Sequence, residues 1–500
     1  MDIKKLFSVL ILGVFAGGSY AQVPAESEHV LLQGFYWDSQ QVTGWKQLER
    51  YMDEIAKSFT CVWLPPSANA EGASHVGGNN VGYHPRQWNN QNSCWGTADD
   101  LKTLIADFHQ HQVKVIADIV VNHRAGATDW GNFTADDFGA CGQFQLTADH
   151  ICRTDEMNTD PAAGKWNGMA KGGNDTGENW GGARDLDHTS AYVQADVKAY
   201  MGWLKGDFGY DGWRYDFVKG FAPEYIEMYN HSSQPYLSVG EYWDGSYDKV
   251  AAWIEGTGKQ SMAFDFPMKY AALNEGLAKS NYSKMSWIED NTTWRPSGMI
   301  HHHQYNRYAV TFVDNHDTYR DGSKFKGYVE QAYAFILSAP GVPCVFWPHW
   351  QKYQSAIDQQ IAARHVAGIH SQSDVEVTAK DKYYESISKG KRGSLICRIG
   401  FAAPKDVPEG YFLACNGNNW WYYLSDNLSG ISSSVVASRC KVEGHCLDIT
   451  AVAAVPIKVF TTDGRLIDEA STPHYTKLLP AGTYVVQVGQ QSQKILIKGY

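Results

Sequence analysis

The chain has 500 residues, which is enough for two to five domains of about 100–200 residues each. Hydrophobic residues make up 43% of it and charged residues 19%, and its 18 Trp, 29 Tyr and 20 Phe side chains exclude a disordered protein. The formal net charge of −11 opposes binding to nucleic acid or to anionic lipid, so the composition favours a neutral polar partner held by ring stacking and hydrogen bonds.

Residues 1–21 are predicted to be a secretory signal peptide. Lys4 and Lys5 form a short positive region, residues 6–15 are apolar, and residues 19–21 (Ser-Tyr-Ala) form a cleavage site. The apolar run is too short for a membrane-spanning helix, which needs about 20 residues. We therefore expect a secreted protein, extracellular or periplasmic, that has no membrane association once the signal is removed.

Eight short runs of β-branched and aromatic residues alternate with helical patterns through the first three-quarters of the chain. One helical pattern is Leu101, Leu104, Ile105 and Phe108, at positions i, i+3, i+4 and i+7. Eight strands with crossover helices predict an α/β fold, a closed (β/α)8 TIM barrel. The predicted strands are residues 30–35, 61–64, 114–121, 212–216, 236–241, 262–266, 309–314 and 342–346.

The barrel is predicted in two parts, residues 22–122 and 189–370, because the connection after the third strand far exceeds the usual 2–6 residues. Residues 123–188, rich in Gly, Asn and Asp, should form an inserted domain. Residues 371–450 alternate like an antiparallel β domain. Residues 451–500 contain three more strands, which either end that sheet or form a separate terminal module.

The nine cysteines of an exported chain allow disulfides but cannot all pair within it. Cys141 with Cys152 and Cys440 with Cys446 are the closest pairs in the sequence, which makes them candidates for local bridges. The sequence does not fix the connectivity.

Three acidic residues stand at or just beyond the carboxyl ends of different predicted strands, where active sites form in this architecture: Asp216, Glu241 and Asp317. Arg214 and Asp216 are two residues apart on one strand, so the guanidinium can keep that carboxylate ionised. Glu241 follows apolar residues that favour its protonated form. One ionised and one protonated carboxyl form the pair that glycoside hydrolysis needs.

Each acid taken alone also fits a structural role, as a strand-end residue paired with a cation. The whole set argues against that role. Asp118, Asn122 and His123 follow the third strand and His316 stands next to Asp317, so polar side chains from several strands converge on one rim.

Four segments in this order resemble the signature segments of the alpha-amylase family of glycoside hydrolases (family 13), and other segments resemble its plant-type members. The likeness covers about residues 29–425. The four are Asp118-Ile-Val-Val-Asn-His123, Gly212-Trp-Arg-Tyr-Asp-Phe-Val-Lys-Gly220, Val239-Gly-Glu-Tyr-Trp243 and Phe312-Val-Asp-Asn-His-Asp317. A fifth, Arg184-Asp-Leu-Asp-His188, resembles the short segment near the end of that family's inserted domain. Those that resemble the plant-type members are Leu32-Gln-Gly-Phe-Tyr-Trp37, Trp63-Leu-Pro-Pro66 and Gly82-Tyr-His-Pro85.

This resemblance implies a role for each acid. Asp216 would be the nucleophile, Glu241 the general acid and base, and Asp317 the residue that fixes sugar hydroxyls and stabilises the transition state. The implied substrate-binding residues are Tyr83, His123, Arg214, Lys219 and His316.

The resemblance also implies a calcium ion (Ca²⁺) between the barrel and the insertion. Its ligands would be the Asn122 amide oxygen, the Asp175 and Asp185 carboxylates, and the backbone carbonyls of Glu178 and Gly220. Such a set of hard oxygens suits Ca²⁺. From composition alone, this Gly/Asn/Asp-rich stretch would be an ordinary loop.

The expected function is a secreted alpha-amylase that cuts internal α-1,4-glucosidic bonds of starch, glycogen and maltooligosaccharides with retention of configuration. The alternatives are a maltooligosaccharide-forming or transglycosylating member of the same family, or a non-catalytic glucan-binding protein. The expected partner is therefore an α-glucan and not nucleic acid, and we expect a monomer. The terminal residues 451–500 also resemble C-terminal modules of exported Bacteroidetes proteins, some of which are sorting signals, so attachment to the cell surface is an alternative location.

Two further segments have competing interpretations. His301-His302-His303 is predicted to be a solvated loop, because three consecutive side chains do not easily share one metal ion. Residues 420–423 (Trp-Trp-Tyr-Tyr) are predicted to be strand core, with an accessory glucan platform as the minority alternative.

Overall fold

The computed structural model describes residues 23–71, 81–290, 293–320, 322–429, 439–443, 445–462, 464–488 and 491–497. The predicted signal peptide lies outside these residues. Within the described part, no helix is both long enough and apolar enough to cross a membrane.

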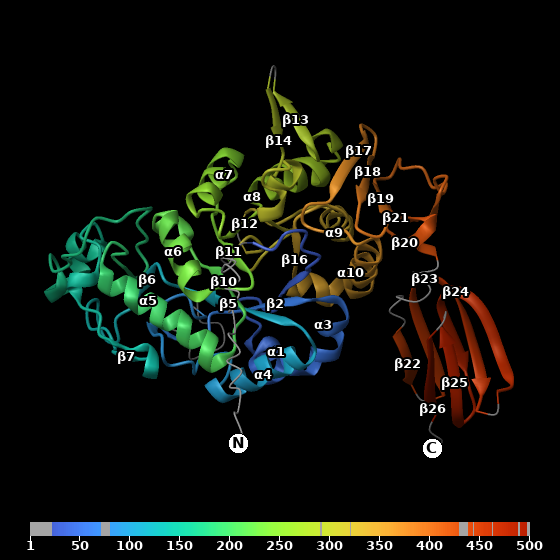
Figure 1. The fold of residues 1–500 in the computed structure, drawn as a ribbon, viewed down its shortest axis with the longest axis horizontal. Coiled ribbons are helices and arrows are strands. Elements are labelled where there is room, and N and C mark those ends of the chain that lie inside the picture. The colour runs from blue at the N-terminus through green and yellow to red at the C-terminus, as the bar shows by residue number, and fades with distance from the viewer. Residues whose placement is uncertain are drawn as a thin grey trace, which may run out of the picture.

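Eight parallel strands close into a barrel, which confirms the predicted TIM-barrel fold. Each strand overlaps one of the predicted runs, and all of their residues except Lys114 are buried. Figure 1 shows the barrel at the centre with helices around it. The strands are β1 (Leu31–Gln33), β2 (Cys61–Leu64), β5 (Lys114–Ile119), β10 (Gly212–Tyr215), β11 (Ser238–Gly240), β12 (Met262–Phe264), β15 (Ala309–Phe312) and β16 (Val342–Phe346).

Helix α4 shows how an amphipathic helix covers the barrel, whereas α9 is buried from Gln331 to Ser338 on all sides. In α4 the predicted residues Leu101, Leu104, Ile105 and Phe108 are all buried, and Thr97 caps the helix by accepting a hydrogen bond from the Asp100 backbone N–H. The α-helices are α1 (Gln40–Thr43), α2 (Trp45–Leu48), α3 (Met52–Ser58), α4 (Ala98–Gln110), α5 (Ala191–Trp203), α6 (Pro223–Ser233), α7 (Tyr247–Gly256), α8 (Phe266–Met268), α9 (Val329–Ser338) and α10 (Trp347–Ala367).

The long connection after β5 forms an irregular lobe on one side of the barrel (Figure 1). Its two ends are held together because β6 (His123–Arg124) pairs with β9 (Arg184–Asp185). The rest is built mainly from short turns, with β7 (Asp136–Asp137) and β8 (Gln143–Phe144) as a small hairpin. Arg124 anchors this hairpin through a fully buried ion pair of 2.8 Å with Asp136.

The predicted bridge between Cys141 and Cys152 is wrong, because both thiols are unbonded. Cys152 is buried while Cys141 is exposed, so nearness in the sequence did not bring the two side chains together. The Cys440 side chain lies outside the described part, so the other candidate bridge stays a prediction.

Two antiparallel sheets follow the barrel. The first, in the order β17-β18-β19-β21-β20, packs against α9, and the second lies beyond it at the C-terminal end (Figure 1). The predicted boundary between residues 450 and 451 falls inside β23, so the second sheet begins earlier, at Arg439. The strands are β17 (Asp374–Lys380), β18 (Tyr384–Lys389), β19 (Ser394–Ile399), β20 (Tyr411–Gly417), β21 (Trp420–Ser425), β22 (Arg439–Glu443), β23 (Cys446–Thr461), β24 (Leu466–Leu478), β25 (Gly482–Val488) and β26 (Gln491–Ile497).

The aromatic residues 420–423 lie in strand β21. Trp420, Trp421, Tyr422 and Tyr423 are all buried, on both faces of the first sheet. They form core, as predicted, and the alternative of an accessory glucan platform at these residues is wrong. The remaining strands are β3 (Asn69–Ala70) with β4 (Pro85–Gln87), and the hairpin β13 (Trp287–Asp290) with β14 (Thr293–Pro296).

Candidate active site

The three predicted acids gather at the carboxyl ends of the barrel strands. Asp216 follows β10 directly, Glu241 follows β11 directly, and Asp317 lies in the loop after β15. Parallel pairing places Tyr215 beside Gly240, so the residues that follow them, Asp216 and Glu241, lie at the same level of the barrel. Asp216 and Glu241 are buried, and Asp317 is more open to solvent.

One guanidinium group connects these acids. Arg214 is fully buried on β10, and its Nη1 lies 2.7 Å from Asp216 Oδ1 and 2.8 Å from Asp118 Oδ1. Its Nη2 lies 2.7 Å from Glu241 Oε1. The register of β10 on β5 pairs Arg214 with Asp118, so the barrel itself fixes this contact. A planar guanidinium that faces three carboxyl groups holds them in a defined arrangement.

The two central carboxyl groups have different pKa values. Burial raises the pKa of Glu241 to about 8, and the charges of Asp216 and Asp317 add to the rise, while Arg214 opposes it. Burial also raises the pKa of Asp216, but only to about 6, because Arg214 offsets more of the effect. At neutral pH this leaves an ionised Asp216 beside a protonated Glu241.

A hydrogen-bond chain fixes Asp317. Gln33 Nε2 donates to His316 Nδ1 at 3.0 Å, so the His316 proton is on Nε2, which lies 3.0 Å from Asp317 Oδ2. Trp37 Nε1 donates to the other oxygen, Asp317 Oδ1, at 3.3 Å. The proximity of His316 and Arg214 lowers the pKa of Asp317, although burial opposes this effect, so this carboxylate stays ionised.

The predicted sugar-stacking residue Tyr83 lies against the same group. Its ring stacks on the His316 imidazole with centroids 5.2 Å apart and planes inclined by 7°. Its hydroxyl donates to Asp118 Oδ2 at 2.7 Å, and Trp63 Nε1 donates to the same oxygen at 3.1 Å. Asp118 therefore links Tyr83 to Arg214.

His123 is held from three directions. Its Nε2 donates to the Tyr83 carbonyl at 2.8 Å, and Asn122 Nδ2 donates to its Nδ1 at 3.2 Å. Trp180, from the insertion, stacks on the His123 ring, with the two ring centroids 3.9 Å apart. Burial lowers the pKa of His123 to about 3, so the imidazole is neutral.

Lys219 is placed differently from the other predicted substrate residues. Its ammonium pairs with Glu178 at 2.8 Å and lies 3.8 Å from Asp244, and its side chain is partly exposed. It therefore lies at the border between the insertion and the loop after β11, in contact with acids other than Asp216, Glu241 and Asp317.

The five predicted calcium ligands also come together. The Asn122 amide donates through Nδ2 to Asp185 Oδ1 at 3.0 Å, and the carboxyl groups of Asp175 and Asp185 contact each other. Glu178 N–H donates to the carbonyl of Lys219, the residue before Gly220, at 2.8 Å. Gly177 makes this contact possible, since a Cβ there would lie 2.2 Å from the same carbonyl oxygen.

The carboxylate oxygen atoms of this cluster have too few hydrogen-bond donors and positive charges around them. Asp175 Oδ2 is buried without a hydrogen-bond partner. Burial, and next the charges of Asp175 and Asp155, raise the pKa of Asp185 well above its usual range. The described residues contain no group of three or more His, Cys, Asp or Glu side chains arranged for a metal ion. This finding is compatible with the predicted set, which has only two carboxylates and otherwise uses amide and backbone oxygens, the ligands that Ca²⁺ accepts.

The sequence interpretation did not assign Trp37, Gln33 or Trp180 to the site. Gln33 is the last residue of the first barrel strand and Trp37 follows that strand, and this place at a strand end is the feature of the sequence that could have indicated a site residue. Trp180 lies in the irregular insertion, where no periodic pattern predicts a position.

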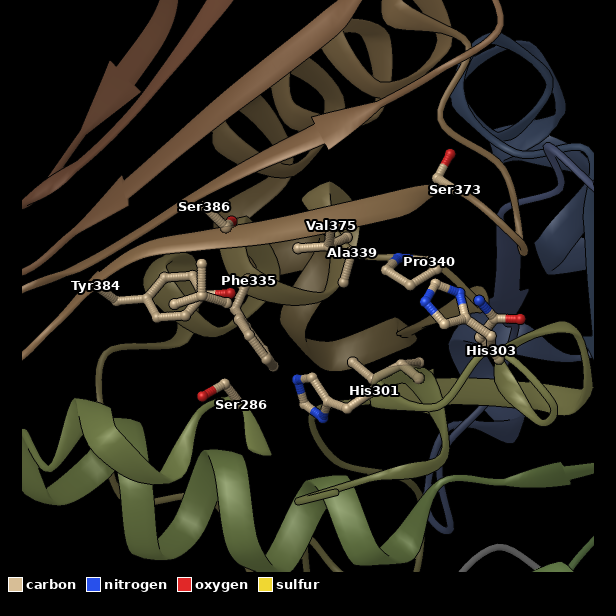
Figure 2. Close-up of a pocket in the computed structure, with 13 residues that line it drawn as sticks. Ser286, His301, His303, Phe335, Ala339, Pro340, Ser373, Val375, Tyr384 and Ser386 are labelled. Atoms are coloured by element: carbon tan, nitrogen blue, oxygen red, sulfur yellow. The ribbon is translucent and has the colours of Figure 1, made fainter. Parts of the chain in front are cut away.

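His301-His302-His303 is only partly the solvated loop that was predicted. His303 is exposed, but burial lowers the pKa of His301 to about 4. Both line a cavity between the barrel and the first antiparallel sheet, where His301 faces Phe335 and Ser286 (Figure 2). The ring of His301 is held by a hydrogen bond of 3.0 Å to the Ser297 hydroxyl.

The closed barrel and the acids at its carboxyl ends define a TIM-barrel enzyme, and comparisons with known proteins give its family. Residues 45–348 match the model of the alpha-amylase catalytic domain. The chain is 31% identical over 423 residues to Probable alpha-amylase 2 of Arabidopsis thaliana, covering 80% of this chain and 94% of that protein. It therefore belongs to the alpha-amylase family of glycoside hydrolases, and it is an enzyme.

Other relatives span several activities. Alpha-amylase 3, chloroplastic, of Arabidopsis thaliana is 31% identical over 412 residues, which are 78% of this chain and 42% of that longer protein. The Glucan 1,4-alpha-maltotetraohydrolase of Roseateles saccharophilus is 26% identical, over 78% of this chain and 72% of that protein. The Anoxybacillus alpha-amylase structure matches with a TM-score of 0.55 at 16% identity, over 80% of this chain and 99% of that one, which shows the shared fold.

Proposed function

We propose that the protein is a secreted alpha-amylase that hydrolyses internal α-1,4-glucosidic bonds of starch, glycogen and maltooligosaccharides with retention of configuration. The observation that carries this proposal is the contact of Arg214 with both Asp216 and Glu241, together with the different pKa values of the two acids. Retaining glycosidases need a nucleophile and an acid about 5–5.5 Å apart, and two carboxyl groups held by one guanidinium suit that spacing.

In the proposed first step, the ionised Asp216 attacks the anomeric carbon of the bound sugar. Glu241 gives its proton to the glycosidic oxygen as the C–O bond breaks, so the leaving sugar departs as an alcohol. A covalent bond then joins the sugar to Asp216. In the second step Glu241, now ionised, takes a proton from water, whose oxygen attacks the anomeric carbon and frees Asp216.

The other residues are proposed to bind and orient the sugar. Asp317, ionised and fixed by His316 and Trp37, would accept hydrogen bonds from sugar hydroxyls and stabilise positive charge in the transition state. Tyr83 would stack on the sugar ring, and the neutral His123, whose two ring nitrogens are hydrogen-bonded to Tyr83 and Asn122, would line the same subsite. Lys219 would serve the leaving-group side, at the border of the insertion.

We propose Ca²⁺ as the resident ion at Asn122, Asp175 and Asp185 and at the carbonyls of Glu178 and Gly220. The buried Asp175 oxygen without a partner and the adjacent Asp185 carboxylate support this assignment. When bound, the ion would supply positive charge that joins the insertion to the segment after Asp216. These residues fix that segment and take no part in bond cleavage.

Analysis of the products separates the proposed endo-acting enzyme from its rival, a maltooligosaccharide-forming or transglycosylating enzyme. The rival has some support, because one relative is named a maltotetraohydrolase and another a cyclomaltodextrin glucanotransferase. Amylose should lose its iodine stain early while mixed oligosaccharides appear, and NMR should detect the α-anomer first. One dominant oligosaccharide, or products longer than a maltoheptaose substrate, would favour the rival.

A further inference from the structure

A buried ion pair lies at the base of the loop that carries Asp317. Lys269 is the first residue of helix η8 (Lys269–Gly276), which follows β12 and α8, and Asp314 stands two residues beyond the end of β15. Lys269 Nζ lies 2.8 Å from Asp314 Oδ1 and donates to the Val313 carbonyl at 2.7 Å. Both side chains of the pair are fully buried. The pair therefore fixes a hydrogen-bond acceptor three residues before Asp317.

The Asp314 carboxylate accepts hydrogen bonds from two later points of this loop. The Thr318 hydroxyl donates to Asp314 Oδ1 at 3.0 Å. The Phe325 N–H donates to the same carboxylate, at 3.1 Å to Oδ1 and 3.2 Å to Oδ2. Hydrogen bonds to a carboxylate are short and strong, so these contacts hold the loop against the barrel.

The Thr318 hydroxyl also holds the turn that contains Asp317. Its oxygen accepts a hydrogen bond from the Asn315 N–H at 3.0 Å. The Asn315 side-chain oxygen in turn accepts from the N–H groups of Asp317 at 3.0 Å and of Thr318 at 2.8 Å. These hydrogen bonds fix the backbone of Asp317, whereas His316 and Trp37 fix its carboxylate.

The two hydrogen bonds of Thr318 use both functions of a hydroxyl group. The Asn315 N–H can only donate, so the hydroxyl proton is directed to Asp314. Thr318 is fully buried, so no water replaces either bond if the hydroxyl is removed. Valine has nearly the same shape as threonine and can neither donate nor accept.

We propose that Thr318 is a positioning residue for bond cleavage, whose hydroxyl, held by the Lys269–Asp314 pair, sets the place of the Asp317 carboxylate in the active site. This inference rests on the proposed function, in which Asp317 stabilises positive charge on the sugar. That charge develops only as the bond breaks, so a displaced carboxylate weakens binding of the transition state more than binding of the substrate. A misplacement of about 1 Å can cost about 100-fold in rate.

The first test is the variant Thr318→Val. We expect kcat for maltoheptaose to fall at least about tenfold, while KM stays within about twofold of the parent. Thr318→Ser keeps the hydroxyl and should restore kcat to within about threefold of the parent. If the valine variant does not fold, Thr318→Ala takes its place in the comparison.

Binding of a transition-state mimic separates positioning from stability. An oligosaccharide with a positively charged iminosugar ring carries charge where Asp317 acts, so its dissociation constant should rise at least about tenfold in Thr318→Val. Maltoheptaose should bind about equally with and without this change in a Glu241→Gln background, where it is not cleaved. Isothermal titration calorimetry measures both. The control Thr257→Val removes another fully buried hydroxyl, which donates to the Ile254 carbonyl at 2.8 Å, and should lower only the melting temperature.

Two outcomes would overturn the proposal. In the first, Thr318→Val has a lower melting temperature but keeps the kcat and the mimic affinity of the parent, so that Thr318 has only a structural role. In the second, Thr318→Ser is as impaired as Thr318→Val, so that the hydroxyl is not responsible. Failure of the proposed function would look different, because the parent itself would not cleave maltoheptaose.

Discussion

Arg214 Nη2 lies 2.7 Å from Glu241 Oε1, so the proposed general acid contacts a permanent cation and still has a raised pKa. The main physical reason is burial of the Glu241 carboxyl, and the charges of Asp216, Asp317 and Asp118 add to it. The one guanidinium is shared, since Asp118 and Asp216 already lie within 2.8 Å of it. Keeping one proton in this cluster relieves the repulsion, and Glu241 is the group that holds it.

Replacing Glu241 with Gln should lower kcat on starch by about 10²–10⁴-fold, because the amide cannot give a proton to the leaving oxygen. An aryl maltoside with an acidic phenol as its leaving group should lose much less activity in the first step, since that group departs without a proton. Stopped-flow release of the phenol measures this step. Glu275→Gln, at an exposed position, is the control. A loss of less than about tenfold on starch would contradict the assignment.

Activity should depend on pH as a bell-shaped curve. Below about pH 6 Asp216 gains a proton and cannot attack, and above about pH 8 Glu241 loses the proton that it must donate. The plot of kcat/KM against pH for maltoheptaose should therefore show a rising acid limb near 6 and a falling alkaline limb near 8. A steady rise in activity through pH 9 would be incompatible with Glu241 as the acid.

Trp37→Phe should reduce kcat/KM by roughly 10–100-fold, because a hydrogen bond to a charged group is worth about 1.5–3 kcal/mol. The phenyl ring keeps the apolar contact but removes the N–H that donates to Asp317 at 3.3 Å. Trp203→Phe, on α5, should have little effect. If Trp37→Phe lowered the melting temperature and left kcat/KM unchanged, Trp37 would have only a structural role.

Removing Ca²⁺ should lower the melting temperature. If the free ion is present at 100 times its dissociation constant, its loss costs about 2.7 kcal/mol. Calorimetry in EGTA and in excess CaCl2 measures the shift. Asp175→Asn should abolish most of it, while Asp149→Asn, at an exposed position of the insertion, should keep it. Equal melting temperatures of the parent in the two buffers would contradict the proposed Ca²⁺ site.

Lys269→Met should cost about 3–5 kcal/mol of unfolding free energy, because it leaves the buried Asp314 carboxylate without its cation. Lys269 Nζ lies 2.8 Å from Asp314 Oδ1, and both side chains are fully buried. The control Lys279→Met breaks an exposed pair with Glu275 and should cost less than about 1 kcal/mol. Denaturation in urea measures both values, and similar losses for the two variants would contradict the expected effect of burial.

The barrel could be predicted from the sequence because its strands are short apolar runs separated by helical periodicity, two local patterns. The presence of the insertion could be predicted from its length, but its internal structure could not, because Trp180 and Cys152 lie in turns whose path is set by contacts with distant residues. Trp180 packs on His123, and Cys152 donates its N–H to the Asp185 carbonyl. The predicted boundary at residue 451 was wrong for a related reason. Strand β23 is one long strand that pairs with β22 at its start and with β25 at its end, and the sequence does not show this change of partner.

The sequence by itself determined the barrel, the family and the placement of Asp216, Glu241 and Asp317 at strand ends, because these follow from local periodicity and short ordered segments. Only the tertiary structure decided that Arg214 also contacts Asp118 and Glu241, and that Trp37 fixes Asp317. It also decided that the aromatic run of β21 is core while Tyr328 and Phe401 are exposed. Burial and electrostatic interaction depend on distances between residues far apart in the chain, and folding sets those distances.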